Sequence, residues 1–138
     1  MIKSIDHILV AVKDLDKAVE DYSLVFGFGP TWQGSHPSLG TKNALFPLEN
    51  MYLELISKDD EGPLGEYIDE HIKKNGESVF GLALETDDIE KAKKKLSASF
   101  EVDLEIQMEK VWIIFQKKKD TGKTFLCLWI FPEESLPF

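Results

Sequence analysis

The sequence predicts an α+β fold in which two βαβββ modules form a cupped mixed sheet with the helices on its outer face. Three observations support this prediction. Short apolar, β-branched runs alternate with stretches that place apolar residues at helical spacing. The order of strand, helix and three strands occurs twice, on either side of a linking helix. Two landmarks of the first half recur at one fixed offset in the second.

The first strand and helix are the clearest part of the pattern. Residues 5–12, IDHILVAV, form a short apolar run that indicates a mostly buried strand. Asp14 follows at the position of a helix N-cap, where its carboxylate can accept a backbone N–H of the first turn. An apolar stripe at helical spacing then runs to Phe26. Gly27 is expected to end the helix because glycine readily adopts a positive φ.

The rest of the first module reads as strands around a loop. A short strand is predicted over 28–32, and the run QGSHPSLGTKN at 33–43 is predicted to be a loop because it is rich in turn formers. A loop of this length in a compact domain is often functional. A hairpin is predicted over 43–47 and 51–57, with Tyr52, Glu54 and Ile56 on one face of its second strand.

An internal repeat places the second module. Asp14-Leu15-Asp16-Lys17-Ala18 aligns with Asp88-Ile89-Glu90-Lys91-Ala92 at an offset of 88 − 14 = 74. The same offset places Met51–Ile56 on Phe125–Ile130, strand on strand. The predicted layout is a single domain, 1–138, with module one at about 1–58, a linking helix at about 63–75 and module two at about 76–131. The strands predicted for module two are Val79–Glu85, Val102–Met108, Val111–Gln116 and Thr124–Phe131.

Composition excludes several classes of partner. The net charge of −9 argues against nucleic acid or an anionic membrane surface, since both require a basic face. The sequence shows no signal peptide or long apolar segment, so a cytoplasmic location is expected. The single cysteine, Cys127, permits no intrachain disulfide, and its apolar surroundings, FLCLWIF, indicate a buried side chain.

The chain resembles the vicinal oxygen chelate superfamily, which includes glyoxalase I, extradiol dioxygenases and bleomycin-resistance proteins. The residues that carry the resemblance are DHILVAVKDLDKA, the helix end LVFGF, HPSLGTKNALFPL and YLELI. The last two look most like the glyoxalase-like subgroup, and the resemblance covers nearly the whole chain. It implies a small-molecule ligand held in the cup and, because two-module members often pair, a homodimer.

The resemblance also implies a metal site. In this superfamily the first and fourth strands of each module supply the ligands, and His7 and Glu54 match the first-module histidine and carboxylate. Such a pair suits divalent Fe, Mn, Ni, Zn or Co, and Glu54 could also move a proton. The offset maps His7 to Gly81 (7 + 74 = 81) and Glu54 to Leu128 (54 + 74 = 128). Neither side chain can bind a metal, so the metal is expected to be weakly held or absent.

Each candidate residue has a second interpretation. A hydrogen bond between His7 and Glu54 would satisfy both groups without a metal. His36 could be a third ligand, a substrate contact or an exposed loop residue. Asn43 could bind substrate or cap a turn, and Trp32 could line a pocket or fill the core.

Two functions therefore remain open. The first is a lyase, isomerase or dioxygenase that acts on a metal-chelated substrate with adjacent oxygens. The second is a binding protein that sequesters an aromatic or amphipathic ligand without chemistry. Gly81 and Leu128 favour the second, because they make the second half of the cup apolar.

Overall fold

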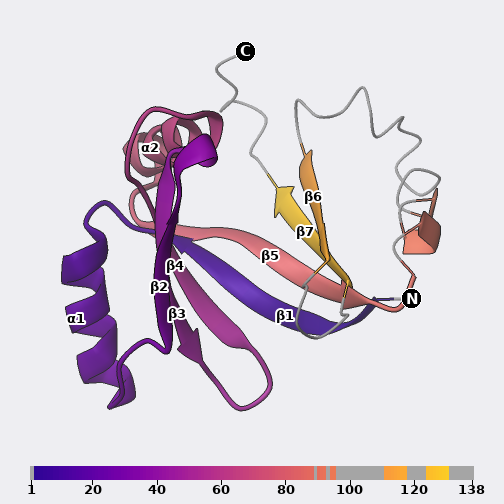
Figure 1. Ribbon diagram of the computed structural model, residues 1–138, viewed down its shortest axis with the longest axis horizontal. Coiled ribbons are helices and arrows are strands. Elements are labelled where there is room, and N and C mark those ends of the chain that lie inside the picture. The colour runs from indigo at the N-terminus through magenta and orange to yellow at the C-terminus, as the bar shows by residue number, and fades with distance from the viewer. Residues whose placement is uncertain (1, 89, 93, 96–110, 118–123, 131–138) are drawn as a thin grey trace. The chain divides into compact units, whose positions relative to one another are not determined.

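The computed structural model describes residues 2–88, 90–92, 94–95, 111–117 and 124–130, and its fold class is α+β, as predicted (Figure 1). The elements are β1 (Ile2–Ala11), α1 (Leu15–Phe26), β2 (Trp32–His36), the 3₁₀ turn η1 (Pro37–Leu39), β3 (Thr41–Pro47), β4 (Tyr52–Lys58), α2 (Pro63–Asn75), β5 (Ser78–Thr86), β6 (Val111–Lys117) and β7 (Thr124–Ile130). The chain packs as two units. One unit is His7–Phe80, and the other is Met1–Asp6 with Gly81–Phe138.

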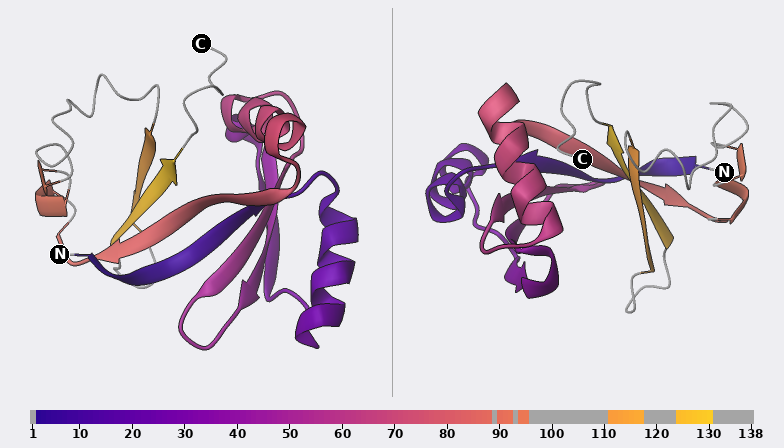
Figure 2. Two further views of the ribbon diagram at one scale, coloured as in Figure 1. Left: turned by 180° about the vertical axis from the view of Figure 1, so that it is seen from behind. Right: turned by 90° about the horizontal axis from the view of Figure 1, so that it is seen from above.

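The sheet of the first unit has the strand order β2-β3-β4-β1. Strands β2, β3 and β4 pair antiparallel, whereas β4 pairs parallel with β1. A parallel pair requires a long connection, and α1 with the following hairpin strands supplies it (Figure 2). The first unit therefore has a strand, a helix and three strands in the βαβββ order, with the start of β1 assigned to the other unit.

Helix α1 covers one face of this sheet. The Asp14 carboxylate accepts the backbone N–H of Lys17 at 3.0 Å, and Gly27 ends the helix at φ 78°. The helix packs Leu15 and Ala18 against inward-facing residues of three strands. The buried core formed there consists of Val10, Val12, Leu15, Ala18, Ala44, Phe46 and Leu55. Because alternate residues of a strand point to opposite faces, the intervening residues of these strands lie on the other side of the sheet.

Helix α2 lies at the end of the sheet where β4 ends (Figure 1). Ile68 on this helix is fully buried, and the ring of Tyr67 lies 5.3 Å from that of Phe80 at the start of β5. A salt bridge of 2.9 Å between Lys58 and Glu66 joins the end of β4 to the first turns of the helix. These contacts fix the end of β4 within the first unit.

His71 connects the last turns of α2 to β5. Its Nε2 lies 2.9 Å from the hydroxyl of Ser78, and that hydroxyl donates to the carbonyl of Gly76 at 3.1 Å. The amide nitrogen of Asn75 lies 3.5 Å from Nδ1 of the same ring. The neutral ring with a hydrogen on Nε2 satisfies this network, and partial burial lowers the pKa of His71.

The lowered pKa of His71 predicts a loss of stability in acid. The unfolded chain, in which the histidine pKa is about 6.5, binds the proton more readily than the folded protein. The contribution of His71 to the free energy of unfolding is therefore fully present above about pH 6.5 and declines below it. The decline stops once the pH is below the lowered pKa of the folded protein. Urea unfolding at about pH 7.5 and 5.5 should show a larger loss for the unmodified protein than for His71→Gln. Equal losses in the two proteins would contradict this assignment.

The predicted loop over 33–43 is wrong. Residues Gln33–His36 belong to β2 and pair with Thr41–Ala44 of β3, and the turn formers Pro37 and Gly40 are confined to η1 and its C-terminal end. The strand predicted over 28–32 begins instead at Trp32. The prediction failed because Gly34 and Ser35 have low strand propensity and suggest a turn. In the structure, antiparallel pairing with β3 holds both residues in a strand despite that propensity.

In the second unit, β6 and β7 pair antiparallel, and β7 pairs antiparallel with β5. Asp88 precedes a helix in this unit, and the start of that helix repeats the start of α1. The Asp88 carboxylate accepts the N–H of Lys91 at 3.0 Å, and the Asp88 carbonyl accepts that of Ala92, as Asp14 does for Lys17 and Ala18. The direction of β7 against β5 differs from the parallel pairing of β4 with β1. The strand predicted at Val102–Met108 lies outside the described residues.

Candidate functional site

The predicted site residues lie on the face of the first unit's sheet that α1 does not cover, which we call the His7 face. Residues that are paired across neighbouring strands point to the same side, so the strand register arranges this face in four rows. The rows are Pro47–Tyr52–His7, Trp32–Leu45–Glu54–Leu9, Gly34–Asn43–Ile56–Ala11 and His36–Thr41–Lys58. As predicted, Tyr52, Glu54 and Ile56 share one face of β4.

Glu54 lies at the centre of the His7 face and is 9% exposed. Its neighbours in its own row are apolar, so its two oxygens reach diagonally to the rows on either side. Oε2 lies 3.2 Å from Nε2 of His7, and Oε1 accepts a hydrogen bond of 2.6 Å from the side-chain amide of Asn43. A buried carboxylate needs such partners, because desolvation without them is costly. The two contacts hold Glu54 in one orientation.

His7 is fixed by an aromatic contact as well as by Glu54. Its ring stacks on that of Tyr52, with centroids 4.4 Å apart and planes at 17°, and the residue is 7% exposed. Cross-strand pairing places these two side chains in the same row. The stacking fixes the plane of the imidazole, and the contact with Glu54 fixes the direction of Nε2. The structure thus brings His7 and Glu54 together, as the resemblance implies.

Asn43 has a role that the sequence did not predict. It lies inside β3 and is 4% exposed, so it caps no turn. Its amide nitrogen donates to Glu54, whereas its Oδ1 is buried without a hydrogen-bond partner in the described structure. Because the oxygen and nitrogen of an amide point to opposite sides of Cγ, Oδ1 is directed away from Glu54. The residue therefore orients the carboxylate and leaves one acceptor unused.

His36 lies on the same face but apart from the pair. It ends the edge strand β2, in the row of Thr41 and Lys58, and is exposed. By position in the sheet, His36 is two rows and two strands from Glu54, and three rows and three strands from His7. Within the part of the chain that the structure describes, no three His, Cys, Asp or Glu side chains come close enough together to hold a metal ion.

The geometry of His7 and Glu54 fits half of a metal site. Two ligand atoms about 2.1 Å from one tetrahedral zinc ion lie roughly 3.4 Å apart, close to the separation of Nε2 and Oε2. The hydrogen bond from Asn43 to the other carboxylate oxygen is the kind of contact that orients a ligating carboxylate. The same separation of 3.2 Å also lies within hydrogen-bonding distance, so both interpretations of the pair agree with it.

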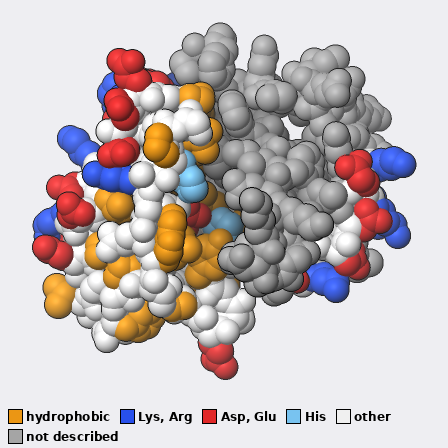
Figure 3. Space-filling view, viewed as in Figure 1, with side chains coloured by type: hydrophobic (Ala, Val, Ile, Leu, Met, Phe, Trp, Pro, Cys, Tyr) orange, Lys and Arg blue, Asp and Glu red, His pale blue; other side chains and the backbone are white. Residues whose placement is uncertain are grey.

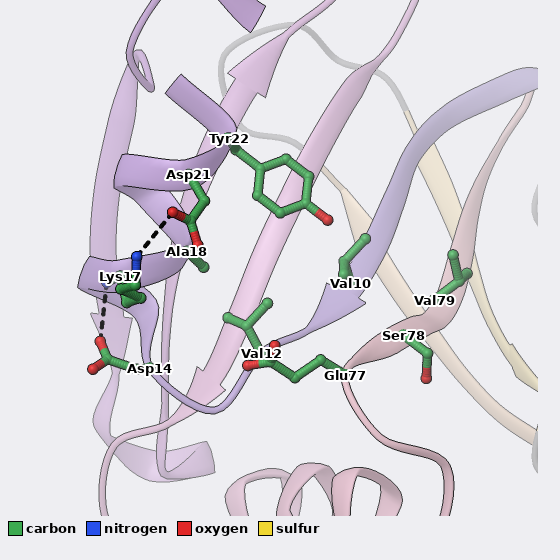
Figure 4. Close-up of a pocket in the computed structure, with 10 residues that line it drawn as sticks. All are labelled: Val10, Val12, Asp14, Lys17, Ala18, Asp21, Tyr22, Glu77, Ser78 and Val79. Carbon is green, nitrogen blue, oxygen red and sulfur yellow. Dashed lines mark hydrogen bonds and ion pairs between the residues drawn. The ribbon is translucent and has the colours of Figure 1, made fainter. Parts of the chain in front are cut away.

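A cavity of about 380 Å³ lies on the opposite face of β1, between α1 and the start of β5 (Figure 4). It contains none of the predicted site residues. Its carboxylates are already engaged: Asp14 caps α1, Asp21 pairs with Lys17 at 3.0 Å, and Glu77 accepts the N–H of Lys13 at 2.7 Å. Because these carboxylates already have structural partners, we take the His7 face rather than this cavity as the candidate functional site.

Trp32 is a residue of the His7 face whose position the sequence left open. A Cβ placed on Gly34 would lie 2.1 Å from Cη2 of the indole, which shows that the ring lies directly over the glycine. Trp32 is 47% exposed, so it is not a core residue. A tryptophan two residues before a glycine in one strand is the sequence signal that could have indicated this arrangement. On the face shown in the space-filling view, histidine atoms lie among hydrophobic side chains (Figure 3).

Comparison with solved structures identifies the class of fold. A methylmalonyl-CoA epimerase in complex with methylmalonyl-CoA and NH4⁺ has a TM-score of 0.67 and 22% identity, over 93% of this chain and 85% of that one. A hypothetical protein from Bacillus halodurans has a TM-score of 0.67 and 21% identity, over 95% and 85%. The epimerase from Mycobacterium tuberculosis has a TM-score of 0.64 and 19% identity, over 91% and 79%. At these identities the likeness shows the fold alone.

Residues 5–113 match the model of the glyoxalase-like domain family, and this match together with the fold supports the vicinal oxygen chelate superfamily. The match covers most of the chain, which therefore belongs to the glyoxalase-like domain family. None of the curated proteins compared with the chain matches it. Among the described residues, no helix is both long enough and apolar enough to cross a membrane.

Proposed function

We propose that this protein binds a small molecule with adjacent oxygens on the His7 face and that Glu54 accepts a proton from it. The observation that carries the proposal is the buried Glu54 carboxylate, which Asn43 and His7 hold from two sides at 2.6 and 3.2 Å. A carboxylate held in one orientation in a mostly apolar setting is suited to proton transfer. A proton transfer of this kind is the step of an isomerase or lyase, whereas a dioxygenase would also need O₂ and a redox-active metal ion.

Glu54, Asn43 and His7 would have different roles in this proton transfer. Glu54 would take a proton from a carbon next to a carbonyl; the C–H electron pair would form a C=C bond as the carbonyl π pair moves to the oxygen. The carboxyl group would then return the proton to carbon as the carbonyl forms again. Asn43 would keep the second carboxylate oxygen occupied so that the first faces the ligand. His7 would hold Oε2 of Glu54 through Nε2, in an orientation that stacking on Tyr52 maintains.

His7 and Glu54 are also the residues that would hold a divalent ion, weakly, and such an ion would polarise the carbonyl of the ligand. Two protein ligands form a poorly organised site, so the ion should be lost easily. Homodimer formation and a cytoplasmic location are further expectations of the resemblance.

A second function, sequestration of an aromatic or amphipathic ligand without chemistry, has its own support. Gly81, which the internal repeat makes equivalent to His7, has no side chain to offer a ligand atom. The rows of the His7 face also carry Leu9, Leu45 and Trp32 beside the polar groups.

Hydrogen–deuterium exchange separates the two functions. Hydroxyacetone has adjacent oxygens and a CH₂ group next to its carbonyl, and it serves as the probe. The protein in D₂O, with and without added Zn²⁺, should accelerate loss of the CH₂ proton signal above the rate in buffer. Binding of hydroxyacetone without accelerated exchange would favour sequestration. The absence of both binding and exchange would contradict the proposal.

A further inference from the structure

The side chains next to Asn43 on the His7 face form a small apolar surface with one unused acceptor. The indole of Trp32 lies over Gly34, and Gly34 is paired with Asn43 across β2 and β3. Directly paired residues of antiparallel strands place their Cβ positions about 5 Å apart, so a ring over Gly34 is next to the strand position of Asn43. Leu45 separates Trp32 from Glu54 within one row. We call Trp32, Gly34, Asn43 and Leu45 the indole subsite.

From these contacts we infer that the indole subsite binds a flat aromatic ring that carries an O–H or N–H donor. This inference rests on the proposed function and names the class of ligand that the His7 face would take. The half-exposed indole, with 47% of its surface accessible, offers a flat face for stacking, and Leu45 continues the apolar surface toward Glu54.

The donor follows from Asn43. Its Oδ1 is buried and has no hydrogen-bond partner in the described structure, whereas the nitrogen of the same amide is committed to Glu54. Buried acceptors in folded proteins nearly always find a donor, and a donor on a bound ligand would satisfy this oxygen. An aromatic hydroxyl or ring N–H that reaches the amide while its ring covers Trp32 would meet both requirements.

The charges of the His7 face favour an uncharged ring. Glu54 is buried at its centre, and Lys58, in the last row, is paired with Glu66 at 2.9 Å. No other lysine or arginine belongs to the four rows that define this face. An anionic ligand would therefore be repelled by the Glu54 carboxylate, and no unpaired lysine or arginine in these four rows would offset that repulsion.

The glycine is part of the subsite because it makes room for the ring. An alanine at position 34 would place its Cβ 2.1 Å from Cη2 of Trp32, so the indole would have to move. Gly34→Ala thus displaces the stacking surface without removing it, which makes it an independent test beside Trp32→Ala.

The experiment uses three probes of similar size and chemical-shift titration of ¹⁵N-labelled protein. 4-Ethylphenol has both the ring and the donor, 4-ethylanisole lacks the donor, and 4-ethylcyclohexanol lacks the flat ring. We expect 4-ethylphenol to shift the amides of Trp32–His36 and Asn43, and to bind about fivefold more tightly than either of the other probes. Trp32→Ala and Gly34→Ala should each weaken its binding by about fivefold. Asn43→Leu should abolish the difference between the phenol and the anisole.

Phe28→Ala is the matched control. Phe28 is 42% exposed, but its ring packs against Phe26 and Phe46 on the α1 side, so its removal should leave probe binding unchanged. Equal affinity in Trp32→Ala, shifts centred away from β2 and β3, or no binding of 4-ethylphenol would each overturn the inference. If 4-ethylphenol does not bind as expected but the protein still accelerates exchange of hydroxyacetone, the inference fails and the proposed function stands. If 4-ethylphenol binds as expected but the protein does not accelerate the exchange, the proposed function fails and the indole subsite stands.

Discussion

Replacing Glu54 with glutamine is expected to lower the rate of hydroxyacetone exchange by about 10²- to 10⁴-fold, the usual contribution of a general base. The amide cannot accept a proton from carbon at neutral pH, although it can reproduce the contacts of the carboxylate. Its oxygen can still accept from Asn43, and its NH₂ group can donate to Nε2 of His7 in the other tautomer. The free energy of unfolding should therefore change by no more than about 1 kcal/mol.

Glu66→Gln is the control for Glu54→Gln, because it removes a carboxylate from the surface of α2. Its side chain is 55% exposed and paired with Lys58, and a surface pair of this kind contributes little to stability. Exchange by Glu66→Gln should match that of the unmodified protein. A Glu54→Gln protein that retains more than a tenth of the exchange rate would show that another group accepts the proton.

Replacing Phe46 with alanine is expected to lower the free energy of unfolding by about 3–5 kcal/mol. Phe46 is fully buried on the α1 side of β3, and its ring contacts those of Phe26, Tyr22 and Phe28 at centroid distances of 5.6, 6.2 and 6.4 Å. The cavity left by the ring would have these three aromatic side chains around it. Because half-exposed Phe28 and helix α1 can shift only partly into the cavity, most of the lost contact energy should not be recovered.

Urea unfolding measures the Phe46 effect, with Leu24→Ala as the control. Leu24 belongs to α1 and is 84% exposed, so its truncation should change the unfolding free energy by no more than about 0.5 kcal/mol. A loss below about 1 kcal/mol for Phe46→Ala would mean that β3 and α1 do not share the core described here.

Much of the fold could be predicted because its signals are local. The N-cap at Asp14, the helix end at Gly27 and the matching start at Asp88 depend on a few neighbouring residues, and all three are present. Strand β2 could not be predicted, because Gly34 and Ser35 have turn propensities and only pairing with β3 makes them a strand. The antiparallel direction of β7 against β5 was equally hidden, since strand direction depends on long-range pairing.

The candidate site was predictable in part. His7 and Glu54 could be paired because the resemblance places their strands side by side, and their contact is present at 3.2 Å. The link from Asn43 to Glu54 could not be predicted, because it is a diagonal contact between rows and depends on the register of β3 against β4. The position of the Trp32 ring over Gly34 depends on a side-chain rotamer, which strand pattern does not specify.

The central claim is that His7 and Glu54 form the functional centre of the protein, and titration with Mn²⁺ tests it most directly. Paramagnetic Mn²⁺ broadens the NMR signals of nearby nuclei, so the first amide signals to disappear mark where the ion binds. We predict that the amides around His7 in β1 and Glu54 in β4 broaden first, and that His7→Ala abolishes this pattern. Broadening that begins instead around Asp14, Asp21 and Glu77 on the opposite face, or that is unchanged in His7→Ala, would contradict the claim.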